Sequence, residues 1–302
     1  MFRLSAILVL ILVKSSWVYG LEAEQWPIDW KPFKKHQQLY KEFAVLKFSG
    51  DHEVRSDYFR RFQIISEVLI KEPEWEDGKW MLADEGMTYT GTFTEESGLE
   101  EPARVMKIVL KYTEQCLTAN PNHPLCNFYF AAALGRLISY QGIFSSLKSG
   151  KSIEEKFHVA LNSPWDHRFE GGYTLKNSAR VALGMFYRLV PDSILIKWLF
   201  GFRGDIDKSI AYHQHVKQHG VTNPCNDALL AAAWLCKEDD VGSQERANAM
   251  TILEAIEASD PGNEIEIICK SDALRLKQDT DLACGYTISK QQDSRDFNES
   301  LD

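Results

Sequence analysis

The sequence predicts an all-α protein, a solenoid of stacked antiparallel helix pairs. Apolar residues recur at three- and four-residue spacing in run after run, and each run ends at Gly, Pro, Asn or Asp. Alternating apolar–polar runs bounded by hairpin dipeptides are nearly absent from the sequence. Ala and Gly recur within the runs, and small residues let neighbouring helix axes approach closely.

The first clearly periodic helix is expected in VRSDYFRRFQIISEVLIKEP. There Tyr58, Phe62, Ile65 and Val68 share one face, and Pro73 ends the run. The run EPARVMKIVLKYTEQCL repeats the pattern. Later helices are expected, in chain order, in PLCNFYFAAALGRLISY, SIEEKFHVAL, TLKNSARVALGMFYRLV, DIDKSIAYHQHVKQ, DALLAAAWLC and ERANAMTILEAIEA.

Residues 1–20 have the pattern of a secretory signal peptide. Arg3 supplies a positive start, residues 4–13 are mostly apolar, and Gly20 precedes a plausible cleavage site before Leu21. The apolar run is too short to span a bilayer. The alternative interpretation is an uncleaved anchor.

The rest of the chain divides by composition. We expect N-terminal helices and a capping segment over residues 21–98, degenerate repeats over 99–288 and a disordered tail over 289–302, where apolar residues are few. Trp26 and Trp30 lie beside prolines and are expected to cover the exposed end of the stack.

Charge and hydropathy exclude two classes of function. The whole chain has a net charge of −9, and removing Arg3 and Lys14 with the signal makes it −11. An acidic chain repels phosphate backbones, which argues against nucleic-acid binding. No later apolar run approaches the length of a spanning helix, so no stable membrane insertion is expected. We therefore expect an exported protein, periplasmic or secreted.

The cysteines indicate disulfides. All six lie after the signal, and an even number in an exported chain favours pairing, although six cysteines allow fifteen connectivities. Cys116–Cys126 is the preferred disulfide, because a turn between them brings two helix ends together. A Cys225–Cys236 disulfide is disfavoured, because one continuous helix would separate them by about 16 Å. No CxxC is present to suggest a zinc knuckle or a redox motif.

The stretch CLTANPNHPLCNFYFAAALG resembles the junction between two tetratricopeptide repeats. Pro121 matches the proline that ends one repeat, and Cys116 matches the small residue five positions earlier. Phe130 and Ala131 match the large–small pair of the following helix, while Asn127 stands where the motif usually has Trp. The resemblance implies a tetratricopeptide-like α-solenoid.

Residues 104–236 are similar to the tetratricopeptide-like domain of the regulator of microtubule dynamics family and its bacterial exported relatives. The likeness rests on GIFSSLKSGKSIEEKFHVAL and LGMFYRLVPDSILIKWLFGFRGDIDKSIAYHQHV, which include a second large–small pair at Leu183 and Gly184. The resemblance implies a fold rather than an activity. Microtubule binding is not carried over, because an exported protein does not meet cytosolic tubulin.

The repeat register nominates binding residues. The first helix of each pair is expected to line the concave groove, which selects Phe128, Ala132 and Arg136 in one pair and Met185 and Arg188 in the next. The arginines would bind a carboxylate in a bidentate manner, and the aromatic ring would add buried area.

Trp198 is the sixth nominated binding residue. It lies in DSILIKWLFGFRG, the most apolar stretch after the signal. Packing inside the groove is the preferred interpretation of this stretch, ahead of contact with a partner or ligand, with a membrane surface last.

Motifs of catalysis are absent from the sequence. His215 and His219 share a helix face at a spacing that can hold zinc or copper, but no HExxH accompanies them, and a solvated helix face is preferred. WDHRFEGG is interpreted as a surface loop, and there is no GxSxG or Gly-rich phosphate loop. We expect no enzyme activity and no cofactor.

The expected function is therefore that of an exported protein-interaction scaffold, which binds a peptide or protein segment in its concave groove. The alternative is a small-ligand-binding accessory protein of a periplasmic transport system, resembling the helical trimeric partner of some solute-uptake systems. A deep apolar pocket around Trp198 would favour this alternative. A hydrolase or metal-dependent enzyme that uses the histidines is the third possibility.

Overall fold

The computed structural model describes residues 25–48, 54–140, 143–169, 172–220, 222–237, 242–288 and 290–291. The expected signal peptide lies outside the described residues. Of the expected tail, only residues 290–291 are described, and they form a short strand. Side chains are described for most of these residues, but not for those at 95, 143–147 and 290–291.

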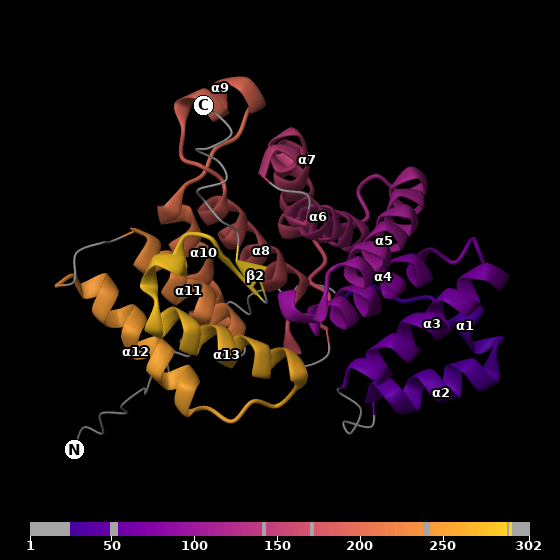
Figure 1. Ribbon diagram of the computed structural model, residues 1–302. Helices are drawn as coiled ribbons and strands as arrows, with labels where there is room; N and C mark the ends of the chain where they lie inside the picture. The colour runs from indigo at the N-terminus through magenta and orange to yellow at the C-terminus, as the bar shows by residue number, and fades with distance from the viewer. Residues whose placement is uncertain are drawn as a thin grey trace, which may run out of the picture.

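The described residues confirm the all-α class (Figure 1). The α-helices are α1 (Lys31–Lys34), α2 (Gln37–Phe48), α3 (Arg55–Lys71), α4 (Glu76–Gly91), α5 (Glu100–Ala119), α6 (Pro124–Ser139), α7 (Ile143–Leu161), α8 (Leu175–Leu189), α9 (Ile194–Phe200), α10 (Ile206–His219), α11 (Pro224–Lys237), α12 (Gln244–Ala258) and α13 (Glu264–Gln278). Short 3-10 helices occupy Glu95–Ser97 and Thr280–Ala283. Strands β1 (Tyr286–Thr287) and β2 (Lys290–Gln291) pair antiparallel, a small hairpin that the sequence pattern did not predict.

Polar caps fix where several helices begin. The Thr174 hydroxyl accepts a hydrogen bond from the backbone N–H of Asn177 at the start of α8, and the Asp205 carboxylate accepts one from Lys208 at the start of α10. Such side-chain acceptors satisfy N–H groups that have no partner within the helix. At α6, Pro124 stands in the first turn, where its missing N–H costs nothing.

Helices pack mainly on their neighbours in sequence, as in a solenoid. Extensive contacts join α3 to α4, α4 to α5, α5 to α6, α6 to α7, α7 to α8, α8 to α10, α10 to α11 and α11 to α12. Figure 1 shows this order, running from α1 in indigo to α13 in yellow. One apolar core surrounds α2 to α6, and a second surrounds α10 to α13.

The array curves back on itself, so its two ends meet. The backbone N–H of Arg55 at the start of α3 donates to Glu264 Oε2 on α13 over 2.8 Å, although 209 positions separate the two residues. Gly91 at the end of α4 lies against the side chain of Ile265. The first turn of α13 therefore lies against the start of α3 and the end of α4.

Three disulfides connect the six cysteines. Cys116–Cys126 joins α5 to α6 across the Pro121 turn, which confirms the preferred pairing. Cys225 and Cys236 both lie on α11 and bond elsewhere, to Cys269 and Cys284, so the disfavoured disulfide is absent. Three disulfides fit an oxidising extracellular environment. Within the described ranges, no helix is both long enough and apolar enough to cross a membrane.

Candidate functional site

A cavity of about 430 Å³ lies on the concave side of the helix array. Its wall is built mainly from α6, α7 and α8, and residues from distant parts of the chain complete it. Phe93 lies two residues after the end of α4, and Ile288 follows β1. A volume of this size is typical of small-molecule sites.

Helical spacing explains which side chains form the wall. On α8, Val181, Met185 and Leu189 are separated by four residues and present one face to the cavity. On α6, Ala132 and Gly135 occupy the facing positions, and a Cβ added at Gly135 would meet no atom closer than 4.0 Å. Small residues at these positions leave the interior unfilled.

The chemistry of the wall is apolar with a few polar groups. Phe128, Ile153 and Phe157 supply large apolar surfaces. The polar groups are mostly amides and hydroxyls, such as those of Asn177 and Ser178. Such a wall suits a mainly apolar ligand that a few polar contacts orient.

Arg136 is the one formally charged residue among the described residues that line the cavity. Its Nη1 donates to Thr90 Oγ1 over 2.9 Å and to the Met87 carbonyl oxygen over 3.3 Å, both in the last turns of α4. Nearby Tyr140 also lines the cavity, and burial raises the pKa of its hydroxyl, although the Arg136 charge opposes that rise. The Tyr140 hydroxyl therefore stays protonated at neutral pH.

The structure brings four of the six nominated binding residues together. Phe128, Ala132 and Arg136 of α6 and Met185 of α8 all line the cavity. The repeat register selected them because it identifies the helix faces that point to the concave side. Their role in binding stays a prediction.

The predicted position of Arg188 in the binding groove is wrong. Its side chain is buried at 6% exposure, and its Nη1 and Nη2 donate to the carbonyl oxygens of Ala283, Cys284 and Tyr286 over 2.5–3.0 Å. Burial lowers its pKa to about 10. The guanidinium anchors the C-terminal segment to α8, so it is not free to bind a ligand in the groove.

The expected packing of Trp198 inside the groove is also wrong. Trp198 is 80% exposed on α9, and the cavity lies elsewhere. The buried residues of this stretch are Ile196 and Phe202, and Phe202 does line the cavity. Helix α9 is too short for the periodicity to reveal which of its apolar residues face inward.

The histidines do not converge on a common centre. The rings of His215 and His219 stack with centroids 4.4 Å apart on α10. His213 is buried and its Nδ1 bonds Asn226 Oδ1 over 2.9 Å, while burial lowers its pKa to about 4. Among the described residues, only Cys116, His123 and Cys126 have metal-ligand spacing, and their two sulfur atoms form a disulfide.

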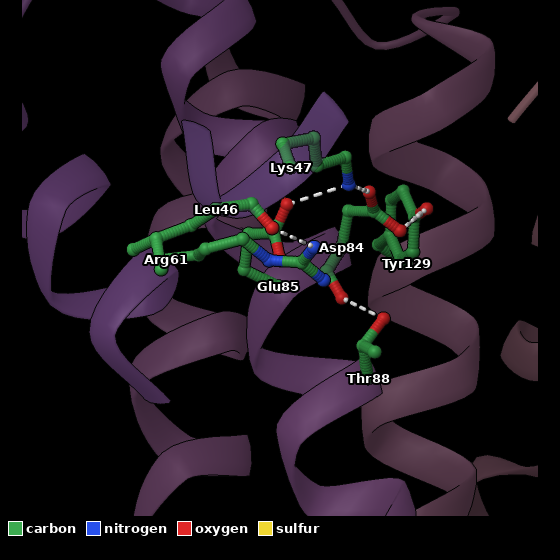
Figure 2. Close-up of polar contacts among 7 residues, drawn as sticks. All are labelled: Leu46, Lys47, Arg61, Asp84, Glu85, Thr88 and Tyr129. Carbon is green, nitrogen blue, oxygen red and sulfur yellow. Dashed lines mark hydrogen bonds and ion pairs between the residues drawn. The ribbon is translucent and has the colours of Figure 1, made fainter. Parts of the chain in front are cut away.

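A buried ionic cluster, which the sequence pattern did not predict, lies on α4 near the cavity wall. Lys47 Nζ lies 2.6 Å from Glu85 Oε1 and 3.2 Å from Asp84 Oδ2, and Arg61 Nε lies 2.8 Å from Glu85 Oε2 (Figure 2). The Tyr129 hydroxyl of α6 donates to Asp84 Oδ1 over 2.7 Å. These contacts fix α4 against α2, α3 and α6, one turn before Met87 joins the cavity wall.

Burial and charge act in opposite directions within this ionic cluster. Burial raises the pKa of Glu85. Burial acts in the same direction on Asp84, but the Lys47 charge and the Tyr129 hydrogen bond outweigh it and lower the pKa. The adjacent acids inside the apolar run WMLADEGM were the signal available in the sequence.

Neither a protein-family model nor a curated protein sequence matches this chain. The resemblance to the regulator of microtubule dynamics family therefore stays a prediction that rests on the motifs quoted above.

Proposed function

We propose that this protein is exported and binds a small, mainly apolar molecule in the cavity between α6, α7 and α8. The observation that carries the proposal is the apolar cavity of about 430 Å³, whose wall combines α6, α7 and α8 with Thr287 and Ile288 of the C-terminal segment. A peptide needs a long open groove, whereas here Thr287 and Ile288 of the C-terminal segment form part of the cavity wall.

Export is supported by two independent features. The pattern of residues 1–20 is that of a signal peptide, and three disulfides fit an oxidising compartment. A periplasmic or secreted binding protein that delivers its ligand to a transport system is consistent with both.

The apolar wall supplies the binding energy. Removing roughly 200 Å² of apolar ligand surface from water contributes about 5 kcal/mol at ~25 cal/mol per Å². The loss of translational and rotational freedom offsets part of this, so dissociation constants near the millimolar range are expected for a purely apolar ligand that buries this area.

The test is to fill the cavity. Ala132→Trp places an indole in the space that Ala132 and Gly135 leave open. We expect wild-type protein to bind an apolar fluorescent probe such as N-phenyl-1-naphthylamine with one site, and Ala132→Trp to weaken binding at least tenfold. Ala247→Trp, on an exposed position of α12, is the matched control. Equal binding by all three proteins would contradict the proposal.

The second candidate is recognition of a protein or peptide partner, and α9 favours it. This helix projects at one edge of the molecule (Figure 1) and exposes Ile194 by 79%, Leu195 by 59%, Trp198 by 80% and Leu199 by 55%. Exposed apolar patches of this kind mark interaction surfaces.

Crosslinking in the native compartment tests the second candidate. Trp198→Ala should lose a specific crosslinked partner that the wild type retains, while probe binding in the cavity is unchanged. The matched control is Ile70→Ala, because Ile70 on α3 is 75% exposed. A crosslinking pattern that Trp198→Ala leaves intact would remove α9 as the contact surface.

A further inference from the structure

We propose that the ligand is an amphiphile with one carboxylate head group, which Arg136 binds, and an apolar body that fills the rest of the cavity. This inference rests on the proposed function and adds the chemical class of the ligand. It starts from the uneven distribution of charge in the wall: the described lining residues include one cation and no acid.

Arg136 lies where its positive charge favours an anionic ligand. The side chain is half-buried beside an apolar cavity, where a charge loses hydration. The protein groups that contact it are the neutral hydroxyl of Thr90 and the carbonyl oxygen of Met87, and no described carboxylate is paired with it. A ligand anion in the cavity would supply the missing countercharge.

The two hydrogen bonds that Arg136 makes leave other N–H donors of its guanidinium for a ligand. A guanidinium carries five N–H donors, and both described bonds use Nη1. These bonds reach the C-terminal turns of α4, whose partial negative charge attracts the guanidinium and orients it. The donors on the other nitrogens match the two oxygens of a carboxylate, which arginine binds in a bidentate manner.

The rest of the wall restricts the body of the ligand. Ile153, Phe157 and Phe202 offer no hydrogen bond to a sugar or a peptide backbone. A cationic head group would be repelled by Arg136, and a dianion would retain one uncompensated charge. A long-chain monocarboxylate supplies one negative charge for Arg136 and an apolar chain for the apolar wall.

The test compares three probes that share a twelve-carbon chain: dodecanoate, dodecanol and dodecyltrimethylammonium. Each displaces N-phenyl-1-naphthylamine from purified, disulfide-intact protein, at concentrations below micelle formation. We expect wild-type protein to bind dodecanoate at least tenfold more tightly than dodecanol, and the cation most weakly. Arg136→Gln should bring dodecanoate to the affinity of dodecanol, whereas Arg136→Lys should retain part of the preference.

Arg104→Gln, an exposed position on α5, is the matched control and should leave the order unchanged. Equal affinity of wild-type protein for dodecanoate and dodecanol overturns the head-group inference while leaving the apolar site intact. If no probe binds wild-type protein, the proposed function itself fails. The comparison of dodecanoate with dodecanol on wild-type protein tests the inference by itself, so the test does not depend on whether Arg136→Gln folds.

Discussion

Gly184 of α8 lies directly against the imidazole of His213 on α10. A Cβ at position 184 would stand 2.6 Å from His213 Nε2 and 2.8 Å from its Cδ2, closer than side-chain carbons approach. The ring cannot easily move away, because its Nδ1 bonds Asn226 Oδ1 and its helix packs on α8 and α11. The small residue that the repeat resemblance selected is therefore required by close packing between helices.

We expect Gly184→Ala to destabilise the protein. Overpacking against His213 costs about 1–3 kcal/mol, and the higher helix propensity of alanine offsets up to ~1 kcal/mol of that. The control is Gly135→Ala on α6, where a Cβ would meet its nearest atom at 4.0 Å and the propensity gain should dominate. The free energy of unfolding, measured in urea, should fall for Gly184→Ala and hold or rise for Gly135→Ala.

The buried state of His213 makes stability depend on pH. Its pKa is lowered to about 4 because burial outweighs the opposing Asn226 hydrogen bond, and the Arg188 charge adds a smaller effect in the same direction as burial. The unfolded chain titrates this group near 6.5, so the neutral ring stabilises the fold above that pH. As the pH falls from about 6.5 to 4, only the unfolded state gains the proton, and about 3 kcal/mol of stability is lost.

Comparing variants isolates this contribution. His213→Leu removes the titrating group, so its free energy of unfolding should fall less steeply between pH 7 and pH 5 than that of the wild type. His219→Leu, exposed on the same helix, should keep the wild-type slope. Identical slopes for wild type and His213→Leu would show that His213 takes up its proton over the same pH range in the folded and unfolded states.

The ionic cluster on α4 predicts a large effect from a conservative change. Glu85→Gln removes the anion that faces both Lys47 and Arg61, and Arg61 and Glu85 have side chains 3% and 2% exposed. Removing one partner of a buried ion pair costs about 3–5 kcal/mol. Chemical denaturation measures the loss.

A surface pair provides the comparison for Glu85→Gln. Glu42 pairs with Arg60 on the outside of α2 and α3, with side chains 39% and 35% exposed. Exposed ion pairs contribute less than about 1 kcal/mol, so Glu42→Gln should be nearly neutral. Similar losses for the two variants would mean that water reaches the cluster around Glu85.

The disulfides are expected to contribute unequally. Cys236–Cys284 closes a separation of 48 residues and Cys116–Cys126 a separation of 10. Loop-closure entropy then predicts losses of about 4 and about 3 kcal/mol when each pair is replaced by alanine. Thermal unfolding without reductant should rank the two variants in this order, and the reverse order would show that strain or packing outweighs loop length.

The candidate site was predictable in part. Repeat register selected Phe128, Ala132, Arg136 and Met185, because position along a helix tells which residues share a face. The register misassigned Arg188, which is three residues after Met185 on α8. The Arg188 guanidinium binds the carbonyl oxygens of Ala283 and Tyr286, which lie nearly 100 positions away in the chain. Periodicity identifies a face but not what covers it.

By itself, the sequence determined the all-α class, most of the longer helices and the Cys116–Cys126 disulfide, because these depend on spacing and turn residues within short stretches. Only the tertiary structure decided that the array curves until Arg55 meets Glu264, that Arg136 faces a cavity and that Trp198 faces solvent. Curvature accumulates from small rotations at each helix–helix contact. Those rotations depend on packing between residues far apart in the chain, which local patterns do not contain.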